Sequence, residues 1–197
     1  MKTPYVNLKL QWKKERSRLL PIIEKILSEG TYVIGKEVDN FEKNIAKFCG
    51  TKYAVAFNSG TDALTLGLML LGVKKGDEVI TPPNSFISST SSIIHIGAVP
   101  IFADVLDDQN IDPKEIEKKI TKKTKAIMPV HLTGRICDMK QIIKISKTYK
   151  IPIIEDAAQS IGSKYFNKKA GSFGDIGCFS THPLKNLNAC GDGGFFV

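Results

Sequence analysis

The chain has 197 residues and a formal net charge of +8, from 28 Lys and Arg against 20 Asp and Glu. With 42% hydrophobic and 24% charged residues, its composition excludes a disordered chain, a collagen-like repeat and a bundle of membrane-spanning helices. A compact fold of this size buries roughly 70% of its unfolded surface, so it needs no disulfide or structural metal to be stable. No apolar signal core precedes Lys13 and Lys14, and we therefore expect a soluble cytoplasmic protein.

The first part of the chain has helical character. Residues 8–27 are mostly helix formers, with Pro21 as a break or a helix start. The next helix is predicted over 37–48, where apolar residues recur at helical spacing. These residues are Val38, Phe41, Ile45 and Phe48.

Strand and helix patterns then alternate. The apolar run 53–57 predicts a strand that ends at the turn 58–60. Residues 61–71 are apolar nearly all round, which predicts a helix buried against a sheet. A strand over 78–81 and a helix over 88–96 follow.

The alternation continues through the second half of the chain. Strands are predicted over 99–102, 126–130 and 151–154, and a helix over 139–149. Segment 112–115 offers a helix start, with Asp as the N-cap, Pro at the first helical position and an acid three residues after the cap.

This regular alternation predicts an α/β domain with a mostly parallel, buried sheet. In such sheets the ligand site lies beyond the carboxyl ends of the strands. That rule selects the turn 58–60 together with Asp104, His131 and Asp156 as candidate site residues.

Segment 59–62 forms a turn at the start of a buried helix. The amide N–H groups and the helix dipole there can bind a phosphate, and Gly60 allows the backbone a close approach. The alternative is a simple helix cap, in which Ser59 or Thr61 satisfies the first N–H groups.

Two further segments carry candidate chemistry. Asp156 follows a buried strand, where an acid is either a helix cap or a functional carboxylate. Lys185 lies between an apolar Pro-Leu pair and a glycine-rich turn, in a stretch with few other charges. A lysine that loses its proton can form a Schiff base with an aldehyde, although most lysines are simply surface residues.

The cysteines, histidines and lysines point to no other site. None of the four cysteines forms a Cys-x-x-Cys pair, which suits a reducing compartment, and the three histidines have no metal-ligand spacing, so we expect no metal. The positive charge favours a solvated or anion-attracting surface. Nucleic-acid binding remains an alternative, but no aromatic residues interleave with the lysines of 114–125.

Six segments together carry a resemblance to a known family. In their order and spacing, the chain from about Asn7 onward resembles the amino-terminal, cofactor-binding part of the DegT/DnrJ/EryC1/StrS family of sugar aminotransferases. The segments are SGTDAL at 59–64, GDEVI at 76–80, PVHLTG at 129–134, EDAAQ at 155–159, GDIG at 174–177, and residues 180–194.

The resemblance implies the aspartate-aminotransferase-like fold and pyridoxal 5'-phosphate (PLP) as cofactor. By position, Lys185 would form the Schiff base with PLP and move the proton during amine transfer. Asp156 would pair with the pyridine nitrogen and Gln159 with the ring hydroxyl. Ser59, Gly60, Thr61 and Ser180 would form the phosphate site, and Phe86 would stack on the ring.

The implied activity is transfer of an amino group, with glutamate as the donor, to a nucleotide-linked keto-sugar in polysaccharide biosynthesis by a homodimer. One alternative is a PLP-dependent sugar dehydratase, which Lys185 disfavours because such relatives have histidine at that position. The other is a non-catalytic PLP-binding or dimerising fragment.

The end of the chain departs from the family pattern. Members continue into more sheet and a small carboxyl-terminal domain, whereas residues 193–197 end the chain in a predicted strand. We therefore expect residues 1–197 to be a PLP-binding large domain that is truncated, with the small domain absent.

Overall fold

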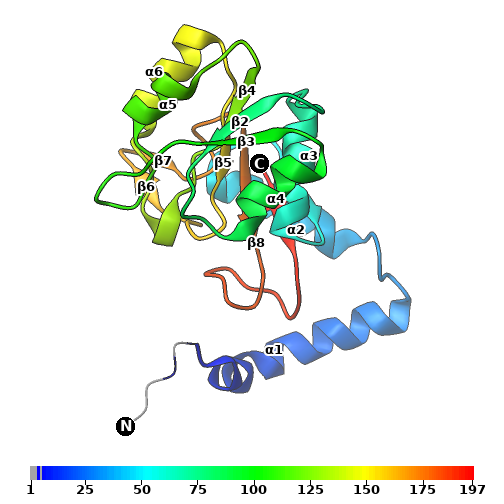
Figure 1. Ribbon diagram of the computed structural model, residues 1–197. Coiled ribbons are helices and arrows are strands. Elements are labelled where there is room, and N and C mark those ends of the chain that lie inside the picture. Colours follow the sequence, from blue (N-terminus) through cyan, green and yellow to red (C-terminus); the bar gives the residue numbers. More distant parts are fainter. Residues whose placement is uncertain (1–3, 5) are drawn as a thin grey trace. The chain divides into compact units, whose positions relative to one another are not determined.

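The computed structural model describes residues 4 and 6–197, and the chain divides into two compact units, 1–41 and 42–197. In the described part of the chain, no helix is both long enough and apolar enough to cross a membrane. Figure 1 traces the elements in chain order.

The first unit is built around α1 (Leu8–Glu29). The side chain of Asn7 caps its start by accepting from the N–H of Leu10 at 3.0 Å, and Gly30 ends it in the left-handed conformation with φ 69°. Pro21 lies inside this helix, so the predicted break or helix start at Pro21 is wrong. A proline removes one N–H donor and crowds the carbonyl four residues earlier, but the 22-residue helix continues on both sides of it.

The remaining elements follow the predicted alternation closely. The helices are α2 (Lys36–Cys49), which begins in the first unit, α3 (Gly60–Leu70), α4 (Ile87–His95), α5 (Pro113–Lys119), the short 3-10 helix η1 (Leu132–Gly134) and α6 (Met139–Tyr149). The strands are β1 (Val55–Phe57), β2 (Glu78–Thr81), β3 (Val99–Phe102), β4 (Thr124–Ile127), β5 (Ile154–Asp156), β6 (Lys164–Tyr165), β7 (Lys168–Lys169), β8 (Ile176–Ser180) and β9 (Gly194–Phe196).

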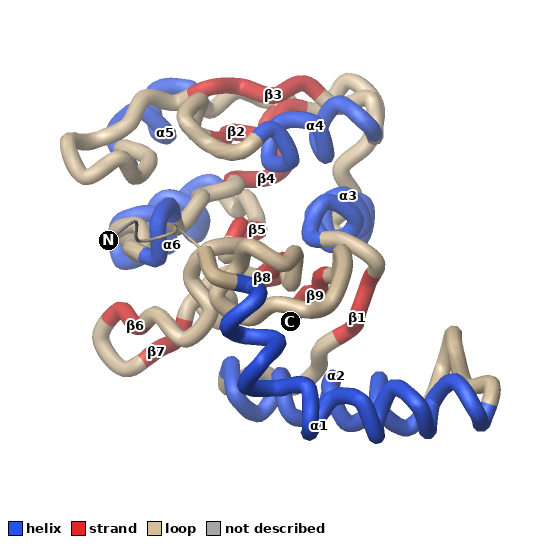
Figure 2. Tube along the Cα trace, turned by 90° about the horizontal axis from the view of Figure 1, so that it is seen from below, coloured by secondary structure: helices blue, strands red, loops and turns tan. Residues whose placement is uncertain are grey.

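The main strands succeed one another in the order β1-β9-β8-β5 and then β4-β2-β3 (Figure 2). Parallel bridges from Ile127 to Ile153 and from Val130 to Asp156 join β4 to β5. Among these seven described strands the neighbours are parallel except at β9, which runs antiparallel to both β1 and β8, and the separate short pair β6–β7 is antiparallel. The predicted α/β fold with a mostly parallel sheet is therefore confirmed.

Two buried clusters cover the two faces of this sheet. Neighbouring strand residues such as Ile153 and Ile154 belong to different clusters, as strand alternation requires. One cluster includes Leu64 and Leu68 of α3, and the other includes Ile116 of α5 and Ile142 of α6. In Figure 1 the helix pairs α3/α4 and α5/α6 accordingly lie on opposite sides of the strands.

Several strand boundaries differ from those that the sequence predicts. β1 begins at Val55 rather than at residue 53, and β4 spans Thr124–Ile127 rather than 126–130. β5 was expected to end at Ile154 but includes Glu155 and Asp156, because the ladder to β8 continues through the two acids. β8 was not predicted as a strand, although it lies in the sheet between β5 and β9.

Candidate functional site

The carboxyl ends of the parallel strands bring several candidate residues to one edge of the sheet. β1 leads to Ser59, β2 to the segment before α4, β5 ends at Asp156 and β8 ends at Ser180. Parallel strands present their carboxyl ends at the same edge, which is where α/β proteins bind ligands.

The start of α3 has the geometry of an anion site. The Ser59 hydroxyl caps the helix by accepting from the N–H of Asp62 at 3.0 Å. The N–H groups of Gly60 and Thr61 have no acceptor within the helix, since they belong to its first turn. Cap and anion site are therefore compatible, because the cap uses one N–H and leaves two others to a ligand.

Gly60 lies where the start of α3 crosses β8. A Cβ at Gly60 would stand 2.7 Å from the Cβ of Ser180, closer than such atoms approach. The hydroxyl oxygen of Ser180 accepts from the N–H of His182 at 3.2 Å, so its own O–H can still donate to a ligand. Glycine at this position is what lets the first turn of α3 and Ser180 share one site.

Asp156 is buried at this edge, with 5% of its surface exposed. Its Oδ2 accepts from the hydroxyl of Ser89 at 2.6 Å, and its Oδ1 accepts from the N–H of Ala158 at 3.2 Å. Each carboxylate oxygen can accept a second hydrogen bond, so Asp156 can still pair with a protonated group.

Glu155 points to the other face of β5 and has a different role. Its side chain is fully buried and accepts from the N–H groups of Gly171, Phe173 and Gly174 at 2.6–2.8 Å. It also lies 2.9 Å from Nε2 of His131, whose Nδ1 accepts from the N–H of Cys137. The carboxylate thus holds the segment that leads into β8, a role that the sequence did not reveal.

Lys185 lies in the loop between β8 and β9, which is closed by a hydrogen bond from the N–H of Thr181 to the carbonyl of Gly193. Its side chain reaches Phe86, with Nζ 6.0 Å from the ring centroid. Phe86 is 68% exposed and lies directly before α4. The amine and the aromatic ring therefore come together although they are distant in sequence.

The side chain of Gln159 is held in place by a hydrogen bond to its amide oxygen. Its Oε1 accepts from the N–H of Thr133 at 2.7 Å. The side-chain NH₂ is then the part of Gln159 that can donate to a ligand oxygen.

Two residues selected by the strand-end rule do not join this group. His131 is engaged with Glu155 on the opposite face, and Asp104 accepts from the N–H of Val105 at 2.8 Å, its own neighbour in the loop. Ser89 was not among the candidates, because a serine-rich helix carries no distinctive sequence signal.

Thiol and metal chemistry have no support at this edge. Burial, followed by the nearby Asp156 and Glu155 carboxylates, raises the pKa of the Cys178 thiol well above its ordinary value, which keeps it protonated. Among the residues that the structure describes, no group of three or more His, Cys, Asp or Glu side chains is placed to hold a metal ion.

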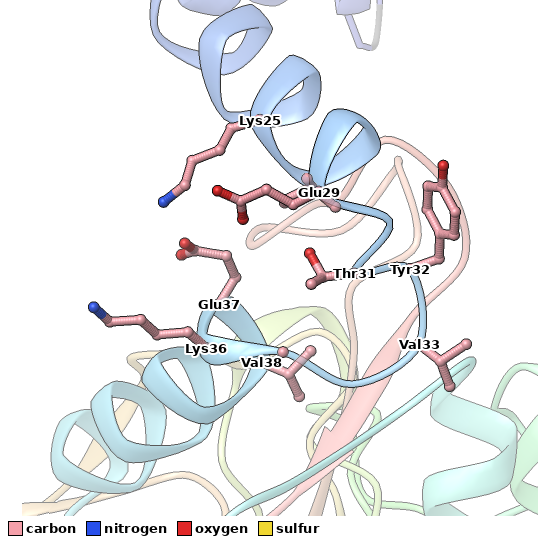
Figure 3. Close-up of a pocket in the computed structure, with 10 residues that line it drawn as sticks. Lys25, Glu29, Thr31, Tyr32, Val33, Lys36, Glu37 and Val38 are labelled. Carbon is pink, nitrogen blue, oxygen red and sulfur yellow. The ribbon is translucent and has the colours of Figure 1, made fainter.

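A pocket of about 240 Å³ lies elsewhere, within the first unit (Figure 3). It is lined by the end of α1, the following turn and the start of α2. Figure 3 shows the charged ends of Lys25, Glu29, Lys36 and Glu37 gathered on one side, away from Tyr32. None of the candidate site residues lines it.

Comparison with known proteins gives close relatives over the whole chain. A UDP-N-acetyl-3-dehydro-alpha-D-glucosamine 3-aminotransferase from Acidithiobacillus ferrooxidans is 42% identical over 196 residues, which are 98% of this chain and 53% of that protein. The chain spans about half the length of the curated relatives it matches.

Solved structures agree. DesV from S. venezuelae, in complex with a ketimine intermediate, matches with a TM-score of 0.96 at 38% identity, over 100% of this chain and 53% of that one. NtdA from Bacillus subtilis with bound cofactor PMP matches with a TM-score of 0.93 at 37% identity, over 100% and 45% of the two chains. The predicted aminotransferase-like fold is thus confirmed. Residues 13–197 match the DegT/DnrJ/EryC1/StrS aminotransferase family, and the chain belongs to that family.

Proposed function

We propose that this chain is the cofactor-binding portion of a PLP-dependent aminotransferase that transfers an amino group, with glutamate as donor, to a nucleotide-linked keto-sugar. One observation carries the proposal. The segment from Phe86 into α4 contacts three of the candidate site residues: Nζ of Lys185 lies 6.0 Å from the Phe86 ring centroid, the Ser88 hydroxyl lies 2.8 Å from that of Thr61, and Ser89 donates to Asp156.

The residues present fit PLP. The cofactor's phosphate suits the start of α3, where Gly60 leaves no side chain between the backbone and Ser180. Its aromatic ring suits the exposed face of Phe86, and its protonated ring nitrogen suits a buried carboxylate with an acceptor position left, as at Asp156. PLP supplies an electron-withdrawing ring that stabilises the carbanion left when an amino acid loses its α-proton.

Each candidate site residue then has a definite task. The N–H groups of Gly60 and Thr61 and the hydroxyl of Ser180 bind the phosphate, while Ser59 fixes their helix turn by its cap. Asp156 holds the proton at the ring nitrogen. The amide NH₂ of Gln159 donates to the ring hydroxyl.

Lys185 would carry and return the proton at Nζ, and it would be the residue that holds the cofactor covalently. Its neighbour His182 accepts from the N–H of Leu184 at 3.2 Å through Nδ1. That bond helps to shape the loop around Lys185.

The proposal extends to a homodimer in the cytoplasm. Large apolar side chains are exposed on α3 and α4, including Met69, Leu70 and Ile87, which supports burial of these helices against a second copy. The four cysteines are all free, as in a reducing compartment. Light scattering tests the dimer, because it should give twice the chain mass of 21.7 kDa and a monomer would contradict it.

The activity is tested by incubating the protein with PLP, glutamate and a nucleotide-linked keto-sugar, and following the product by mass. We expect an aminated sugar from the wild type and none from Lys185→Ala, while the exposed Lys147→Ala retains turnover. Loss of water from the sugar instead would support a dehydratase. Bound PLP without turnover would support a non-catalytic fragment, and full turnover by Lys185→Ala would reject the assignment.

A further inference from the structure

The start of α4 carries serines whose hydroxyls reach the candidate site. Besides the Ser89 bond to Asp156, the hydroxyl oxygen of Ser85 lies 2.6 Å from that of Ser89. The three side chains form a chain of two short hydrogen bonds that leads from the half-buried Ser85 to the buried carboxylate. The tasks assigned above do not use either serine.

The direction of this chain follows from the donors and acceptors available. An ionised carboxylate can only accept, so Ser89 donates its single hydroxyl proton to Asp156. The bond between the two serines must then be donated by Ser85. Ser85 therefore supports Ser89, and Ser89 supports Asp156.

Burial gives this arrangement its weight. Ser89 is 0% exposed and Asp156 is 5% exposed. If the Ser89 hydroxyl were removed, water would therefore have little access to the carboxylate and could not fully replace the lost hydrogen bond. Hydrogen bonds to a charged acceptor are stronger than neutral ones. Together with the N–H of Ala158 on the other oxygen, the Ser89 bond fixes the plane of the carboxylate from both sides.

We propose that Ser89, supported by Ser85, is a positioning residue that fixes the orientation of the Asp156 carboxylate toward the ring nitrogen of PLP. This inference rests on the proposed function. Without the Ser89 donor, one carboxylate oxygen loses its partner and the side chain can rotate away from the ring nitrogen. A ring nitrogen that is less well paired with a negative charge holds its proton less firmly, and the ring then loses part of the positive charge that draws electrons.

The test uses Ser89→Ala, the conservative variant Ser89→Thr and a matched control, Ser92→Ala. Ser92 is also 0% exposed and in α4, but its hydroxyl donates to the carbonyl of Ser89 at 3.1 Å rather than to Asp156. Each protein is titrated with PLP, and the absorbance of the bound cofactor is followed against pH. Circular dichroism of the PLP-free proteins reports folding separately.

We expect Ser89→Ala to weaken PLP binding about tenfold, as for loss of one hydrogen bond to a charged group. A less positive ring makes Nζ of Lys185, once joined to the cofactor, release its proton less readily. The pH at the midpoint of the absorbance change of the bound cofactor should therefore rise by about 0.5–1 pH unit. Ser89→Thr, which keeps the hydroxyl, should restore both values, and Ser92→Ala should leave both unchanged. Ser85→Ala, at a half-buried position, should shift the midpoint in the same direction but by less. If Ser89→Ala does not fold, the result for Ser85→Ala tests the proposal in its place.

Three outcomes would overturn the inference. Ser89→Ala could fold and keep both the wild-type affinity and midpoint, Ser92→Ala could shift them equally, or Ser85→Ala could shift nothing where Ser89→Ala does not fold. In each case the proposed function stands if the wild type binds PLP at Lys185. Failure of the wild type itself to bind PLP would instead reject the proposed function.

Discussion

Adjacent residues Glu155 and Asp156 show how strand alternation separates structure from chemistry. Asp156 faces α4 and meets Ser89, whereas Glu155 faces the other side and meets only His131 and backbone N–H groups. The sequence indicates an acid at the carboxyl end of a buried strand and selects Asp156 as a candidate site residue. The role of Glu155 depends on a loop that folds back from 171–174, which no local pattern reveals.

Glu155→Gln should destabilise the fold strongly. Two carboxylate oxygens now accept four hydrogen bonds, and the amide NH₂ of glutamine would turn one oxygen into a donor that faces other donors. We expect a loss of about 2–4 kcal/mol in the free energy of unfolding, measured by urea denaturation.

The control for this change is Glu117→Gln. Glu117 is exposed and accepts from the hydroxyl of Tyr149 at 3.1 Å. Replacing its carboxylate should therefore lower the free energy of unfolding by no more than about 0.5 kcal/mol. Equal stability of the Glu155 and Glu117 variants would contradict the structural role given to Glu155.

Among the elements, those with a local signal were predicted and those that depend on distant partners were not. α6 has the predicted bounds Met139–Tyr149, and Asp112 caps α5 by accepting from the N–H of Lys114 at 2.8 Å. β8 was missed because its short run Ile176–Ser180 is interrupted by Gly177. That glycine is required by tertiary packing, since a Cβ there would lie 2.2 Å from the Cα of Gly171.

The start of α6 should give the stability a dependence on acid pH. Burial opposes ionisation of Asp138, but hydrogen bonds from Gln141 and Tyr165 outweigh it and lower the pKa of the carboxyl below its ordinary value. The contribution is therefore present above the unfolded pKa of about 4 and is lost as the pH falls through the lower folded value.

Two variants separate the charge from the cap. Asp138→Asn keeps a capping side chain, so it should flatten the acid limb of the stability curve with little loss of helix. Asp138→Ala should also lose about 1 kcal/mol at neutral pH. Thermal unfolding between pH 2 and 7 measures both, and an unchanged acid limb in Asp138→Asn would count against this assignment.

At the scale of the whole molecule, the sheet decides where the chemistry lies. The alternation of elements predicts a mostly parallel sheet, and with it the edge that gathers Ser59 and Asp156. Ser180 lies at the end of β8, a strand that the sequence does not predict, and only the family resemblance makes it a candidate. The contact between Lys185 and Phe86 could be inferred only from the family resemblance, because the two residues come from different loops. The hydrogen bond from Ser89 to Asp156 could not be predicted from the sequence, since a serine in a helix carries no signal of a distant partner.

Reduction of the protein–PLP mixture with borohydride, followed by peptide mapping, tests whether Lys185 holds PLP. We expect a pyridoxyl adduct on Lys185 in the wild type and in Lys147→Ala, and no adduct on the corresponding peptide of Lys185→Ala. A folded wild-type protein with no adduct at Lys185, or with the adduct on another lysine, would show that Lys185 does not hold PLP.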